Sequence, residues 1–164
     1  MSNLTVNIEL LGPVNVYLGI GIEIITAVLL GGLVGMERQV SNKSAGLRTN
    51  ILICIGATLY TSVSFLNLSV GNVADPNRMA AQVVSGIGFL GAGAIIRGQG
   101  NVTGLTTAAT IWVVAAIGVT IGSGYPLIAT IFTLTAYFVL KLIRVKNGNG
   151  NGNGNGNGNG NGNG

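Results

Sequence analysis

Long apolar runs separated by very few charges are the feature that most limits how this chain can fold. Only 12 of the 164 residues are charged, eight basic and four acidic, which is 7% of the chain. An average soluble domain has about 25%. Hydrophobic residues make up 48% of the sequence, and so few charges could not keep that much apolar surface soluble in a monomer. The sequence therefore excludes a soluble globular enzyme and predicts a chain that folds in the lipid bilayer.

Five apolar runs approach the length of a transmembrane helix, which takes about 17–25 residues. The predicted spans are residues 16–36, 51–68, 79–96, 105–122 and 126–143. The predicted fold class is therefore all-α, a polytopic integral membrane helical bundle of about five transmembrane helices. Its transmembrane domain covers residues 16–146, after a polar-to-mixed lead over residues 1–15. Residues 147–164 are Asn-Gly repeats with no hydrophobic face, and we expect this low-complexity tail to be disordered.

Basic residues predict the orientation of the bundle, because cytoplasmic loops are enriched in Lys and Arg. With the N-terminus outside and the C-terminus inside, seven of the eight basic residues lie on the cytoplasmic side and Arg78 alone lies outside. The reverse orientation would leave a single basic residue inside. The sequence therefore predicts N-terminus out and C-terminus in.

Missing residue types exclude several kinds of chemistry. The chain has no His, so it offers no imidazole base, no Ser-His or Cys-His nucleophile and no histidine metal ligand. Cys54 is the only cysteine and lies in an apolar run, where it is expected to be a small buried hydrophobe. The basic residues do not cluster with aromatic ones, so nucleic acid is not an expected partner. The sequence predicts that the protein is not an enzyme.

Small residues recur at helical spacing in two of the spans. Gly31 and Gly35 lie one turn apart on the first helix, and the third helix carries Ala81, Ser85, Gly88 and Ala92 on one face. Small side chains let helix backbones approach closely in lipid, so packing is the main interpretation, with a ligand path as the alternative. Arg78 and Gln82 fall on the same stripe of the third helix. That stripe should face other helices or water, where Gln82 forms an interhelical hydrogen bond or lines a cavity.

Two groups of charged residues are candidates for function. Glu23 would lie about 10 Å inside the first helix if that helix begins near Val16, and a carboxylate at that depth is costly unless protonated or paired. If the span begins nearer Glu23, the residue is a boundary residue instead. Glu37, Arg38, Arg48 and Arg97 are all placed at the inner ends of the helices. They act as topogenic charges or form ion pairs, such as one between Glu37 and Arg48.

Four ordered motifs resemble the MgtC/SapB family of bacterial and archaeal membrane proteins. They are LLGGLVGMERQ (29–39), AGLRTN (45–50), DPNRMAAQVVSGIGFLGAGAII (75–96) and VTGLTTAATIWVVAAIGVTIGSGY (102–125). The resemblance implies that a set of polar residues occupies motif positions: Glu37, Arg38, Arg48, Asp75, Arg78, Gln82 and Arg97. It also implies a glycine framework of Gly31, Gly35, Gly86, Gly88 and Gly91. Longer members carry a cytoplasmic C-terminal domain, so this chain is expected to be a short form without it.

The resemblance also implies a function. Members of the family are multi-pass proteins of the prokaryotic plasma (inner) membrane, associated with magnesium homeostasis, magnesium transport and, in pathogens, virulence. Some are described as restraining the F-type ATP synthase, which makes such a membrane protein an expected partner beside the lipid bilayer. A homo-oligomer is a further candidate assembly. We expect a non-enzymatic regulator or partner-binding bundle for adaptation to low magnesium. The alternative is a transporter of magnesium or another ion, with a small cavity lined by the third helix and by Glu23, Asp75, Gln82 and Ser85.

Ligands for a resident metal are scarce. Mg²⁺ binds oxygen ligands, often through one or two carboxylates and its own waters. The chain has four carboxylates in all, so we assign no metal site and no cofactor, with Mg²⁺ left as a ligand or transported ion.

Overall fold

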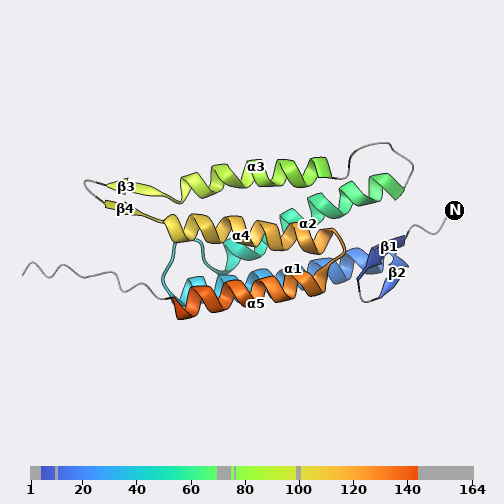
Figure 1. Cartoon of the computed structure of the whole chain (residues 1–164), viewed down its shortest axis with the longest axis horizontal. Helices are drawn as coiled ribbons and strands as arrows, with labels where there is room; N and C mark the ends of the chain where they lie inside the picture. The colour runs from blue at the N-terminus through green and yellow to red at the C-terminus, as the bar shows by residue number, and fades with distance from the viewer. Residues whose placement is uncertain (1–4, 10, 70–74, 76, 99–100, 144–164) are drawn as a thin grey trace, which may run out of the picture.

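The computed structural model of the chain describes residues 5–9, 11–69, 75, 77–98 and 101–143, and within them five helices form one bundle (Figure 1). The helices are α1 (Val16–Val40), α2 (Leu47–Ser69), α3 (Asn77–Gly93), α4 (Leu105–Gly122) and α5 (Pro126–Leu142). Two antiparallel hairpins lie at opposite ends of the bundle. They are formed by β1 (Thr5–Ile8) with β2 (Gly12–Asn15), and by β3 (Ile96–Gly98) with β4 (Asn101–Thr103).

The predicted all-α membrane bundle is confirmed. Three helices are long and apolar enough to cross a membrane: α1, α2 over Leu47–Leu66, and α4, with α5 as a shorter apolar helix. The protein is therefore a multi-pass membrane protein, and its predicted orientation stays a prediction. The predicted third span extends too far: α3 ends at Gly93 rather than at residue 96, because Ile96 already pairs with Thr103 in the second hairpin. The predicted lead ends where α1 begins, at Val16, and part of it forms the first hairpin.

The centre of the bundle is α4. This helix contacts each of the other four, and its buried side chains form the core together with α1, α2 and α5. One core cluster comprises Ala27, Val34, Cys54, Val114, Ile117, Ile121 and Ala129. By contrast, α3 packs on α2 and α4 and lies at the edge of the bundle (Figure 1).

Glycines set the distance between the central helices. A Cβ added to Gly118 would lie 2.4 Å from the Cys54 carbonyl oxygen, and one added to Gly122 would lie 2.3 Å from the Thr58 carbonyl oxygen. The backbones of α4 and α2 are therefore almost in contact, which only glycine allows. Because the two backbones are so close, the buried Thr58 hydroxyl donates a hydrogen bond to the Gly118 carbonyl oxygen at 3.0 Å.

Capping explains where α3 begins. The Asn77 amide donates to the Asp75 carboxylate at 2.9 Å, and the Arg78 amide donates to the Asp75 carbonyl at 3.2 Å. An aspartate placed just before a helix satisfies such orphan amides. Pro76, between this aspartate and the helix, is a residue type that fits the first helical position, but it lies outside the described residues.

Candidate functional site

The last turn of α1 holds a compact polar group. Arg38 is buried and forms an ion pair with the neighbouring Glu37, whose other oxygen accepts a hydrogen bond from the Ser41 hydroxyl at 2.8 Å. A cation in the last turn also interacts favourably with the negative end of the helix dipole. The chain then turns through Asn42, whose φ of 53° is left-handed, a conformation that asparagine tolerates better than most residues.

Asn50 of α2 is another buried polar residue near this end of the bundle, and it was not among the predicted site residues. It is fully buried, and its amide nitrogen donates to the carbonyl oxygens of Ala45 at 2.9 Å and Gly46 at 2.8 Å. Its Oδ1 is buried without a hydrogen-bond partner among the residues that the structure describes. The sequence could have pointed to Asn50, because it is a polar residue that packs against the predicted glycine face of α1. A Cβ added to Gly35 would lie 3.1 Å from the Asn50 Cβ, and one added to Gly31 would lie 2.7 Å from the Cys54 Cβ.

The seven predicted polar residues do not form one cluster. Glu37 and Arg38 lie at the end of the bundle that carries the β3–β4 hairpin, and Arg48 lies exposed in the first turn of α2 at the same end (Figure 1). The backbone of Arg97 reaches that end in β3, opposite Val102. Asp75 and Arg78 are exposed at the other end, where α3 begins. Arg97 and the loop between α1 and α2 therefore lie at the same end of the bundle, as predicted. Arg48 is exposed, whereas Arg38 is buried.

The predicted packing face of α3 is not the face that packs within the chain. Ala81, Ser85, Gly88 and Ala92 are exposed, as is Gly86, and a Cβ added to Gly86 or Gly88 would meet nothing within 4 Å. Ile87 and Gly91 are buried instead, with Gly91 against Ala108 of α4. The physical reason is the position of α3 at the edge of the bundle. An edge helix has neighbours on one side only, and here that side carries the larger Ile87, which fills the space between helices.

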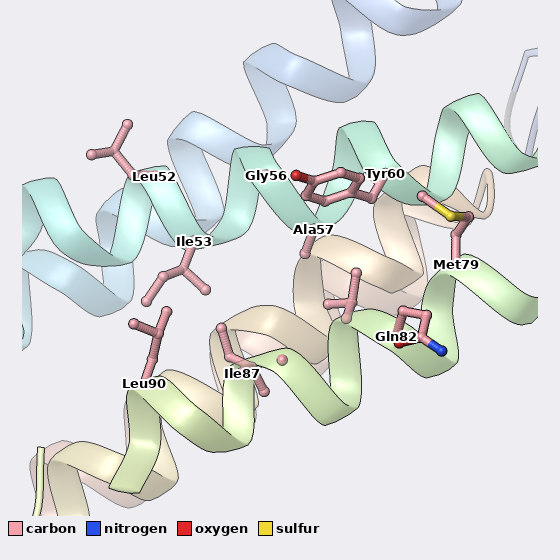
Figure 2. Close-up of a pocket in the computed structure, with 11 residues that line it drawn as sticks. Leu52, Ile53, Gly56, Ala57, Tyr60, Met79, Gln82, Ile87 and Leu90 are labelled. Atoms are coloured by element: carbon pink, nitrogen blue, oxygen red, sulfur yellow. The ribbon is translucent and has the colours of Figure 1, made fainter. Parts of the chain in front are cut away.

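A groove of about 520 Å³ lies between α2 and α3 (Figure 2). From α2 its walls are Leu52, Ile53, Gly56, Ala57 and Tyr60, and from α3 they are Met79, Gln82, Val83, Gly86, Ile87 and Leu90. Gln82 is thus the one residue of the predicted transport cavity that lines it; Glu23, Asp75 and Ser85 do not. This groove, as formed by the described residues, therefore does not have that predicted composition. No group of three or more metal-ligating side chains occurs among them either.

Glu23 lies in a different place, on α1 where that helix faces Ser62 of α2. It is 1% exposed, and its Oε2 lies 2.5 Å from the Ser62 hydroxyl oxygen of α2. The helix begins at Val16, so the carboxyl group is inside the span, as the first interpretation of Glu23 expected. Ser62 was missed, although a helical hairpin pairs the two positions: Glu23 lies eight residues before Gly31, and Ser62 lies eight residues after Cys54, which contacts Gly31.

Comparison with known proteins supports the family resemblance that the sequence motifs indicated. Protein MgtC of Brucella abortus (strain 2308) is 50% identical over 118 residues, covering 70% of this chain and 48% of that protein. Protein MgtC of Salmonella typhimurium (strain LT2) is 47% identical over 123 residues, covering 73% and 52%. An Escherichia coli (strain K12) protein named "Putative magnesium transporter YhiD" is 53% identical over 108 residues, covering 63% and 50%. The chain spans about half the length of these relatives.

No solved structure matches the chain. The model of the MgtC family matches residues 24–148, which include α2 to α5 and most of α1. This match and the identities above confirm the resemblance, and the chain belongs to the MgtC family.

Proposed function

We propose that this bundle is a non-enzymatic regulator in magnesium homeostasis that acts by binding another membrane protein in the plasma membrane of a prokaryote. The name of the Escherichia coli relative, together with the family resemblance, supports the link to magnesium. The groove between α2 and α3 carries the proposal of a partner, because its walls are almost entirely apolar and open at the edge of the bundle. Helices in lipid associate through close packing on such surfaces, whereas a hydrated magnesium ion needs oxygen ligands.

The alternative is a transporter, which the name of the Escherichia coli relative favours. In that case the groove forms one wall of the ion path, and Gln82 is the polar side chain in that wall that contacts the ion. The two functions differ in what the purified protein does alone. A transporter moves Mg²⁺ across a liposome membrane, whereas a regulator supports growth at low magnesium without such a flux.

Groove filling tests the proposal directly. Gly86→Leu places a large side chain in the groove without a clash, because a Cβ at Gly86 meets nothing within 4 Å. The matched control is Gly21→Leu on α1, where a Cβ also meets nothing within 4 Å and which lies outside the groove. Gly86→Leu should reach normal membrane abundance but fail to restore growth at low magnesium in a strain without its own family member, and Gly21→Leu should restore it.

Flux measurement completes the test. We expect the purified wild-type protein in liposomes to show no Mg²⁺ flux above empty vesicles. A flux that Gly86→Leu abolishes would favour the transporter. A reporter fused after Lys146 tests the predicted orientation, because only a cytoplasmic reporter should be active there.

A further inference from the structure

Glu23 is a carboxyl group sealed inside the membrane part of the protein. Its side chain is 1% exposed, and Oε1 has no hydrogen-bond partner among the described residues. It lies seven residues after the start of α1, about 10 Å along the helix. An ionised carboxylate in such a place is costly unless a cation or several donors neutralise it.

The elements packed on α1 bring no cation to this carboxyl group. α1 contacts α2, α4, α5 and the first hairpin, and α4, β1 and β2 carry no titratable residue. The titratable residues on the other packing elements and in the hairpin turn are Arg48, Cys54 and Tyr60 on α2, Tyr137 and Lys141 on α5, and Glu9. Arg48 is 14 residues from Ser62, about 21 Å along α2, and Lys141 is in the last turn of α5 beside Tyr137.

The first hairpin covers the end of the bundle nearest to Glu23. A Cβ added to Gly19, one turn before Glu23 on the same face of α1, would lie 3.1 Å from the Val6 Cβ and 3.2 Å from a Val14 methyl group. Glu9 attaches this hairpin to the turn between α4 and α5. Its amide donates to the Gly124 carbonyl at 2.9 Å, and its carboxylate accepts from the Leu127 amide at 3.2 Å.

Hydrogen-bond geometry at Ser62 shows how the carboxyl group is satisfied. The Ser62 hydroxyl oxygen lies 2.5 Å from Glu23 Oε2 and 2.9 Å from the Thr58 carbonyl oxygen. A hydroxyl group has one proton, so it donates to only one of these two acceptors at a time. If Ser62 donates to Thr58, the bond to Glu23 requires a proton on the carboxyl group. If Glu23 is ionised, Ser62 must turn its proton to Glu23.

We propose that Glu23 and Ser62 form an intramembrane proton-binding site. A proton from water at the hairpin end adds to Glu23 Oε2, so that one carboxylate and one hydronium ion become a carboxylic acid and a water molecule. The new O–H donates to the Ser62 oxygen, and the Ser62 hydroxyl turns to the Thr58 carbonyl. Release of the proton to water reverses both steps. The neutral form leaves Oε1 as an uncharged carbonyl oxygen, so it is the resting form of the site.

Infrared spectroscopy of the protein in lipid vesicles tests this proposal, because a protonated carboxyl group has its own C=O stretching band. The chain has only four side-chain carboxyl groups, and ordinary Asp and Glu residues are ionised at about pH 7. We expect one protonated carboxyl band at that pH, lost in Glu23→Gln and kept in the matched control Glu9→Gln. Ser62→Ala should shift the band to higher frequency, because the hydrogen bond to Ser62 is lost.

A second measurement covers the case in which Glu23→Gln does not fold. Carbon-13 in the carboxyl groups of glutamate should shift the band in the wild type, and Glu9→Gln and Glu37→Gln should each leave it in place, which assigns it to Glu23. Absence of the band at about pH 7, or its persistence in folded Glu23→Gln, would overturn the proposal. An unchanged frequency in Ser62→Ala would overturn the role of Ser62.

Discussion

Small residues at four-residue spacing lie on α4 and on α3, and the two helices use them in opposite ways. On α4, Gly118 and Gly122 press against the α2 backbone, so that an added Cβ would lie within 2.4 Å of a carbonyl oxygen at both positions. On α3, Ala81 and Ser85 have the same spacing but are exposed, and Gly88 has open space around it.

The difference comes from the number of neighbours. α4 lies in the centre of the bundle and contacts four helices, whereas α3 lies at the edge and packs on α2 and α4 (Figure 1). Spacing of small residues shows that a helix face permits close approach in a bilayer. It does not show whether the helix that approaches belongs to the same chain.

Leucine at Gly122 should have the largest effect. The Thr58 backbone carbonyl, 2.3 Å from an added Cβ, cannot move without shifting α2. We expect a loss above the usual overpacking cost of about 1–3 kcal/mol, seen as aggregation or a large drop in Tm in detergent. Gly88→Leu is the control and should keep the wild-type Tm. An equal loss in both variants would show that α3 and α4 do not differ as described.

Composition and motif order were enough to predict the bundle, its family resemblance and the α4 boundaries. Lipid as solvent requires long apolar helices, and that requirement is visible in sequence. The packing face of α3 could not be predicted, because Ile87 and Gly88 are adjacent and only the neighbours decide which one is buried. The Glu23–Ser62 contact was missed because it depends on how α1 and α2 align, which became visible only when Gly31 was found against Cys54.

Two arginines at the end of the bundle that carries the second hairpin differ in burial: Arg38 is buried and Arg48 is exposed. Arg38 is buried and paired with Glu37, so Arg38→Ala removes the guanidinium group that neutralises a largely buried carboxylate. Breaking a buried pair costs about 3–5 kcal/mol, and we expect the lower end of that range. Arg38→Lys should recover part of the loss, because it restores charge but not the planar donor group. A wild-type Tm in Arg38→Ala would show that the pair does not stabilise the bundle.

Truncation of Ile87 should have a smaller effect. Its side chain is the buried contact of α3, whereas Phe89 is 83% exposed. Lipid is as apolar as the protein core, so Ile87→Ala loses packing rather than hydrophobic transfer energy. The expected cost is about 1–2 kcal/mol, below the usual range for this truncation in water. Phe89→Ala should leave Tm unchanged, and thermal unfolding in one detergent compares the two. A greater loss in Phe89→Ala would place the packing face of α3 on the other side.

Arg48→Lys should have the smallest effect on stability and a larger one on function. Arg48 is exposed beside a second groove at the ends of α2 and α3, near Ser44 and Phe89. Its replacement by another cation should change stability by less than about 0.5 kcal/mol. If Arg48 only sets topology, lysine serves equally well, because the positive-inside rule counts charge. If it holds an anionic group of a partner, lysine cannot reproduce the planar, two-pronged contact of a guanidinium group. We expect normal membrane abundance with weaker growth at low magnesium, whereas full complementation would leave Arg48 as a topogenic charge.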